Sequence, residues 1–125
     1  MRPADEWTRQ AEYDLDTAEY MFRGGRYLYA VFMAHLAVEK CLKGLYQAKL
    51  NKVPPKTHNL AYLLNQTGLE APLATQGFLV RLNEAQIATR YPDNLTKMQS
   101  AYPKPIVREI LVQAKETMTW IGKQF

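Results

Sequence analysis

The sequence has a single cysteine, Cys41, in its 125 residues. A lone cysteine excludes an internal disulfide and a cysteine cluster for zinc, and it is typical of a protein from a reducing compartment. Long apolar runs are also missing: the longest, residues 27–38, contains a histidine and falls far short of the roughly 20 residues of a membrane span. The first residues, MRPADEW, carry no apolar signal region. These absences predict a cytoplasmic protein without membrane contact.

Strand patterns and the common motifs for phosphate, metal and nucleophilic chemistry are missing as well. No segment alternates apolar and polar residues convincingly, and no GxxxxGK(S/T) or GxGxxG loop is present to hold phosphates. The two histidines, His35 and His58, lie in different predicted elements, and neither has a nucleophile at a recognisable spacing. We therefore predict an all-α protein with no catalytic triad, no metal site and no cofactor.

The sequence does have one long apolar and amphipathic segment, residues 27–50, which predicts a central helix. At about 100° per residue, its core-facing side chains form one stripe. The stripe consists of Tyr27, Val31, Ala34, Val38, Cys41, Leu42 and Leu45. We predict that Cys41 is a buried thiol rather than a nucleophile, and that His35 is a partly buried, hydrogen-bonded histidine rather than a ligand. An apolar surplus outside the stripe exceeds what one layer of helices covers and predicts a homodimer. Its members are Leu28, Phe32, Met33 and Leu36.

The rest of the chain predicts three further long helices and one short helix. The long helices are expected at residues 5–23, 72–89 and 105–124, and the short helix at residues 58–67 with Thr57 as its cap. Prolines make residues 51–56 and 90–105 irregular connections. The prediction is one domain, residues 1–125, folded as an up-and-down helical bundle of four long helices plus one short helix.

Charge is distributed unevenly, although the net charge of +4 is modest. Residues 40–69 contain five lysines and no acidic residue. Two interpretations stay open for this basic segment: a solvated face that keeps the protein soluble, and an electrostatic footprint for phosphates. Just before it, Glu39 stands four residues ahead of Lys43, the spacing of a helix-surface ion pair.

Four features in order resemble one known family. An amphipathic first helix is followed by GGRYLYAVFMAHLAVEKCLKGLY, then by PPKTHNL, and then by RYPD ahead of the last helix. The most specific parts are residues 37–43 (AVEKCLK), 57–60 (THNL) and 90–93 (RYPD). With these segments in this order, and over about residues 7–121, the chain resembles the HEPN domain of higher eukaryotes and prokaryotes.

Resemblance to the HEPN family implies an all-helical bundle that commonly dimerises, a link to nucleotide or RNA binding, and frequent pairing with a separately encoded small nucleotidyltransferase. Many members are metal-independent ribonucleases that carry an Arg followed four to six residues later by a His. Here Arg26 precedes His35 by nine residues. The other candidates, Arg81, Arg90 and Arg108, are followed by no histidine. The missing pair counts against ribonuclease activity and not against the fold.

Two classes of function follow. The first, which we favour, is a non-catalytic interaction module that binds a partner nucleotidyltransferase, in a toxin–antitoxin-like pair, or a nucleotide through its charged end. The second is a ribonuclease toxin with an unfamiliar active site, such as Arg90, Tyr91 and His58. The candidate ligand-binding residues are Glu39, Lys40, Lys43, His58, Arg90, Tyr91 and Asp93. The sequence leaves open whether the loop after Arg90 returns to the same end of the bundle as the lysine-rich segment.

Overall fold

The computed structural model describes residues 3–125, which fold into helices and loops without a strand. In chain order the helices are α1 (Pro3–Arg23), α2 (Tyr27–Leu50), α3 (Leu60–Gln66), α4 (Leu73–Arg90), α5 (Leu95–Ala101) and α6 (Lys104–Gly122). The predicted all-α bundle is confirmed, and each long helix begins and ends within two residues of its predicted bounds. Among the described residues, no helix has both the length and the apolar content of a membrane-spanning segment.

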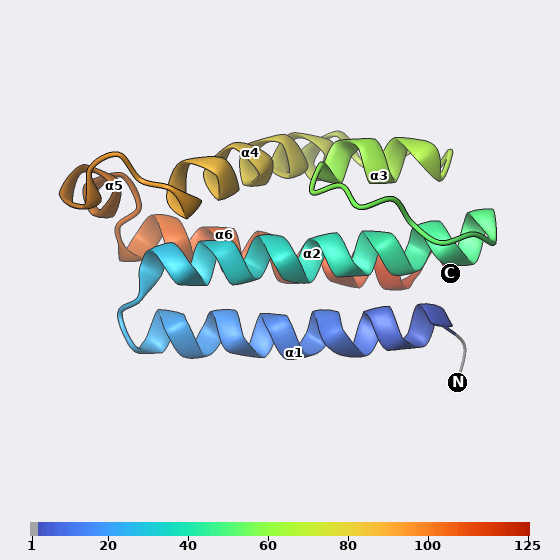
Figure 1. Cartoon of the computed structure of the whole chain (residues 1–125), viewed down its shortest axis with the longest axis horizontal. Coiled ribbons are helices and arrows are strands. Elements are labelled where there is room, and N and C mark those ends of the chain that lie inside the picture. The colour runs from blue at the N-terminus through green and yellow to red at the C-terminus, as the bar shows by residue number, and fades with distance from the viewer. Residues whose placement is uncertain (1–2) are drawn as a thin grey trace.

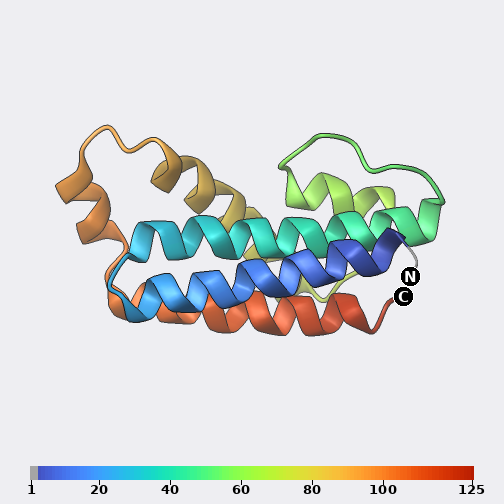
Figure 2. The ribbon, with the colours of Figure 1, turned by 60° about the horizontal axis from the view of Figure 1, so that its bottom comes forward.

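The centre of the bundle is α2, which packs against every other helix. In Figure 1, α1 and α2 lie side by side and run in opposite directions, while α3 and α4 cover the other side of α2. Figure 2 shows α6 running along both α1 and α2. The four long helices therefore alternate in direction, with α2 at the centre of the core.

Burial along α2 follows the predicted stripe except at its first member, Tyr27, which is half-buried. Val31, Ala34, Val38, Leu42 and Leu45 expose no surface, and Cys41 is buried. Full burial of each large aliphatic side chain stabilises the fold by about 1.5–3 kcal/mol, which explains why this helix organises the rest. The apolar surplus is covered only in part, because Leu28, Phe32, Met33 and Leu36 are all half-buried. A single chain therefore leaves some of their surface in contact with water.

The connection from α2 to α3 positions a histidine beside the middle of α2. Asn51 ends α2 in the left-handed conformation, with φ of 53°, and its N–H donates to the carbonyl of Gln47. The two prolines that follow prevent further helix, and the loop runs back along α2 (Figure 1). As a result, His58 lies next to Glu39 rather than at the end of the bundle.

Both short helices depend on an asparagine cap. The predicted cap of α3, Thr57, is wrong by two residues, because the side chain of Asn59 accepts the hydrogen bond from the N–H of Tyr62 at 3.1 Å. The irregular connection predicted at residues 90–105 contains a helix, α5, in which the side chain of Asn94 accepts from the N–H of Lys97 at 3.0 Å. No residue of α5 is buried, so this helix stands outside the core.

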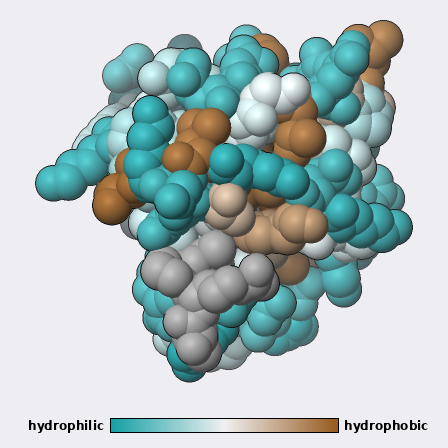
Figure 3. All heavy atoms as spheres, turned by 90° about the vertical axis from the view of Figure 1, so that its right-hand side faces the viewer, coloured by the Kyte–Doolittle hydropathy of each residue, from teal (hydrophilic) through white to brown (hydrophobic). Residues whose placement is uncertain are grey.

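The start of α1, the C-terminus and the loop after α2 lie at one end of the bundle (Figures 1 and 2). Figure 3 shows this end as mainly hydrophilic, with hydrophobic side chains in separate spots rather than in one continuous area. At the opposite end lie the turn between α1 and α2, the end of α4, and α5.

Candidate functional site

A buried polar cluster is centred on Glu39, in the middle of α2. Its side chain is only 4% exposed. One carboxylate oxygen, Oε2, accepts a hydrogen bond from Nζ of Lys43 at 3.0 Å, and Oε1 accepts from Nδ1 of His58 at 2.8 Å. The His58 side chain is 61% exposed, and its Nε2 has no hydrogen-bond partner among residues 3–125. Because a carboxylate only accepts, Glu39 holds the imidazole by Nδ1 and leaves Nε2 to the solvent.

His35 and Asn83 join this cluster to α4 and to the start of α3. The buried His35 ring donates from Nε2 to Oδ1 of Asn83 at 3.1 Å. The same Oδ1 accepts from the N–H of Leu60 at 3.2 Å, and Nδ2 of Asn83 donates to Oδ1 of Asn59 at 3.3 Å. Burial lowers the pKa of His35, against the opposing effects of the bond to Asn83 and the charge of Glu39. The ring is therefore neutral and structural, as predicted.

Asn83 was not singled out in the sequence, although it holds the start of α3, which directly follows His58. The signal that identifies it is positional. Asn83 stands four residues after Leu79 and three before Gln86, both of which are buried, so it occupies the core-facing side of α4. A polar residue at such a position needs a hydrogen-bond partner inside the protein.

Lys43 is enclosed rather than free to move. Its side chain is 10% exposed, and Nζ lies 5.9 Å from the centroid of the Trp7 ring on α1. The Trp7 ring is itself held in place, because its Nε1 donates to Oε1 of Gln47 at 2.8 Å. The predicted pairing of Glu39 with Lys43 is confirmed, but its predicted location on the surface is wrong, since Trp7 covers the pair.

Lys40 faces a different helix. Its Nζ lies 2.9 Å from Oδ2 of Asp14 on α1, in a pair whose side chains are 21% and 7% exposed respectively. This ion pair ties α1 to α2 on the side away from His58. Two of the predicted ligand-binding lysines, Lys40 and Lys43, thus neutralise buried carboxylates of the same chain.

Arg90, Tyr91 and Asp93 form a separate group at the end of α4. The guanidinium carbon of Arg90 lies 5.7 Å from the ring centroid of Phe32 and 5.4 Å from that of Tyr91. Phe32 precedes Glu39 by seven residues, which is about 10 Å along an α-helix. Asp93 is exposed in the loop that follows. The segment after Arg90 does not return to the lysine-rich end, so the predicted residues do not form one site in a single chain (Figure 1).

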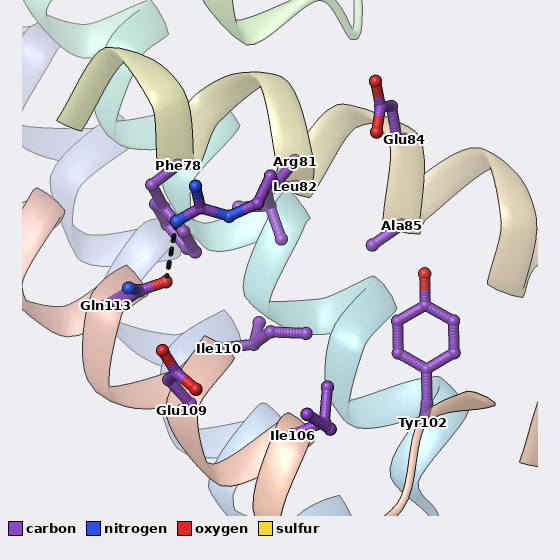
Figure 4. A pocket seen from close by; sticks show the side chains of 10 residues that line it. All are labelled: Phe78, Arg81, Leu82, Glu84, Ala85, Tyr102, Ile106, Glu109, Ile110 and Gln113. Carbon is purple, nitrogen blue, oxygen red and sulfur yellow. Dashed lines mark hydrogen bonds between the residues drawn. The ribbon is translucent and has the colours of Figure 1, made fainter. Parts of the chain in front are cut away.

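A pocket of about 340 Å³ opens between α4 and α6. In Figure 4 its apolar lining comes from both helices, and Arg81 on α4 bonds across to Gln113 on α6 at 3.5 Å. Tyr102 lies at one side, where burial and the charge of Glu84 raise the pKa of its hydroxyl. The lining combines this apolar surface with the carboxylates Glu84 and Glu109.

Neither metal chemistry nor thiol chemistry is supported. Among residues 3–125, no group of three or more His, Cys, Asp and Glu side chains is placed to hold a metal ion. Burial, and to a smaller extent the charge of Glu12, raises the pKa of Cys41 to about 12. The thiol is therefore protonated and inert at neutral pH, in agreement with the prediction of a buried structural cysteine.

Comparisons with known proteins agree with the fold. The family model of the HEPN domain matches residues 4–124. TT1696 from Thermus thermophilus, a crystal structure, is similar over 100% of both chains, with a TM-score of 0.87 and 26% sequence identity. ST0689, an archaeal HEPN homologue, has a TM-score of 0.78 at 24% identity, with 99% of this chain and 98% of that chain covered. No curated protein matches the chain. Because the family match spans nearly the whole sequence, the protein belongs to the HEPN domain family.

Proposed function

We propose that the protein is a cytoplasmic, homodimeric binding module that pairs with a separately encoded small nucleotidyltransferase in a toxin–antitoxin-like system, and that His58 contacts the phosphates of a nucleotide or RNA. Its place in the HEPN family supports the partnership. The observation that carries the ligand contact is the hydrogen bond from Nδ1 of His58 to the buried carboxylate of Glu39. This bond orients an exposed imidazole without consuming its outer nitrogen.

The surroundings of His58 favour an anionic ligand. When both ring nitrogens carry a proton, Nε2 is a charge-assisted donor that points toward solvent, a good partner for a phosphate oxygen. The connection that leads to His58 adds Lys49, Lys52 and Lys56, which are exposed and form no ion pair with a described carboxylate. Unpaired cations along one path raise the local concentration of anions.

Calorimetric titration tests the ligand contact. ATP and a short RNA are titrated at about 50 mM and about 200 mM salt, because phosphate contacts weaken as counterions are added. We expect weak, salt-sensitive binding that falls in His58→Ala and in Lys52→Ala/Lys56→Ala. The matched control is Lys115→Ala, which removes one exposed lysine from α6. Equal binding by His58→Ala and the parent at low salt contradicts the proposed contact.

The partnership needs a separate test. The protein is co-expressed with a small nucleotidyltransferase encoded by an adjacent gene, and the two chains are separated by size-exclusion chromatography. We expect them to elute together in a fixed ratio. Separate elution at micromolar concentration contradicts the partnership and leaves the ligand contact unaffected.

A second candidate function, a metal-independent endoribonuclease with a non-standard active site, is favoured by one observation. An exposed imidazole held by a buried carboxylate is an arrangement that orients a general base. The transition state also needs a charge stabiliser, but Arg90 lies over Phe32 and Lys43 is bound to Glu39. We therefore expect no cleavage of a mixed RNA pool in the presence of a chelator. Cleavage that is lost in His58→Ala would establish the ribonuclease.

A further inference from the structure

The end of the bundle that holds the turn between α1 and α2 carries several exposed cations (Figure 1). Six exposed cations lie at the end of α1, just before α2, at the end of α4, in α5 and in the first turns of α6: Arg23, Arg26, Arg90, Lys97, Lys104 and Arg108. None of these six cations takes part in an ion pair with a described carboxylate. Four carboxylates are close in sequence or space, namely Glu19, Glu84, Asp93 and Glu109. Positive charge remains in excess, and the uncapped first turns of α2 and α6 add to it.

Several of these cations lie over aromatic rings. The ring of Phe22 has Nζ of Lys104 at 6.0 Å and the guanidinium carbon of Arg108 at 5.7 Å from its centroid. Arg90 lies over Phe32 in the same manner. A ring holds one side of a cation and leaves its N–H donors free for oxygen acceptors. The charges are thus held in place, yet remain available to a ligand.

A pocket of about 570 Å³ opens between these cations, where the start of α2 meets α5 and the turn before α6. Arg26 and Lys104 line it, together with the tyrosines Tyr27, Tyr29 and Tyr102. Tyr29 is 65% exposed, so its ring offers an open face. The pocket falls within the size range of small-ligand sites and combines flat aromatic surfaces with cations, the pairing that bases and phosphates require.

We propose that this aromatic end of the bundle binds single-stranded nucleic acid, with one base in the pocket against Tyr29 and the adjacent phosphates on Arg26 and Lys104. The inference rests on the proposed function for its ligand class, but it places the contact at the start of α2, away from His58, which lies beside the middle of that helix. Arg90 lies on a second patch beside Phe32, one helical turn beyond the pocket, and can contact a further phosphate. This spread favours a chain of nucleotides over a free nucleotide. A duplex is excluded because its bases are stacked and paired.

Fluorescence anisotropy with a labelled single-stranded RNA of about 12 nucleotides tests this inference. The variant Arg26→Ala/Lys104→Ala removes two exposed cations from the pocket. We expect it to weaken binding at least tenfold and to reduce the slope of log K against log salt by about 1.4, since each phosphate contact to a single strand contributes about 0.7. Tyr29→Ala removes a neutral ring, so it should weaken binding by about 5- to 150-fold with no change of slope.

The control variant Lys115→Ala/Lys123→Ala removes the same charge from exposed positions in and just after the second half of α6, and should leave affinity for this RNA within about twofold of the parent. Far-UV circular dichroism and urea midpoints verify that all variants are folded. The inference is overturned if the two double variants lose the same affinity for the single-stranded RNA. It is also overturned if the parent binds a duplex or ATP as tightly as it binds the single strand. Binding that is lost in His58→Ala but kept in Arg26→Ala/Lys104→Ala would overturn it while supporting the proposed function. Absence of any binding to the single strand at about 50 mM salt would also overturn it.

Discussion

Replacing Glu39 by Gln tests whether the buried cluster is held by charge. The substitution keeps the size of the side chain, but it leaves Lys43 with no counter-ion and replaces the charged hydrogen-bond acceptor of His58 with a neutral one. Loss of one partner from a buried ion pair costs about 3–5 kcal/mol. Lys43 keeps 10% exposure and its contact with Trp7, so we expect a loss of about 2–4 kcal/mol for Glu39→Gln. That is a large part of the roughly 5–15 kcal/mol that stabilises a domain.

Urea unfolding, followed by circular dichroism and by tryptophan fluorescence, measures this loss. The double variant Glu39→Gln/Lys43→Met removes the stranded charge and should recover about half of the lost stability, because apolar replacement of a buried pair is close to neutral. Glu6→Gln is the control at an exposed pair, in which Arg9 and Glu6 are 66% and 49% exposed, and should cost less than about 1 kcal/mol. The reasoning is refuted if Glu39→Gln costs no more than this control, or if the double variant is as unstable as Glu39→Gln.

Three further predictions concern other parts of the fold. Folding lowers the pKa of His35, so the unfolded chain takes up a proton at a higher pH than the native protein does. The free energy of unfolding should therefore be highest above about pH 6.5 and decrease as the pH falls below that value. Urea titrations at several pH values should show a smaller decrease in His35→Gln. Equal pH dependence in parent and variant contradicts this. Cys41, with a pKa of about 12, should react with a thiol reagent at pH 8 only after unfolding, and immediate reaction of the native protein would show that it is accessible. Light scattering at micromolar concentration should give a dimer for the parent and a monomer for Phe32→Asp, whereas a monomeric parent contradicts the dimer.

The helices were predictable where one periodic signal dominates. Residues 27–50 combine a continuous apolar stripe with Gly25 before them and two prolines after them, and α2 has the predicted bounds. The missed helix, α5, shows the opposite case. Its flanking prolines suggested irregular structure, but Asn94 caps a seven-residue helix between them. Prolines exclude helix only at their own positions and just before them, so a local cap decided the outcome.

The site was less predictable because it depends on contacts between distant segments. The spacing of Glu39 and Lys43 predicted their pairing, whereas their burial depends on Trp7 from another helix. The position of Arg90 depends on how many times the chain crosses the bundle. The loop after α2 runs back to the middle of that helix, so α3 points the same way as α2, and α4 returns to the end where α2 begins (Figure 1). No local sequence pattern in residues 51–59 indicates that this loop runs back along α2.

Asn83 joins the start of α3 to the interior of the bundle through hydrogen bonds of one side chain. One side-chain amide accepts from His35 on α2 and from the first residue of α3, and donates to the cap of α3. These bonds join segments 23 to 48 residues apart in the chain, so they form only when α4 is docked on α2. The start of α3, which directly follows His58, therefore depends on contacts between distant helices: a shift of α4 relative to α2 would break the hydrogen bonds that Asn83 makes with Asn59 and Leu60.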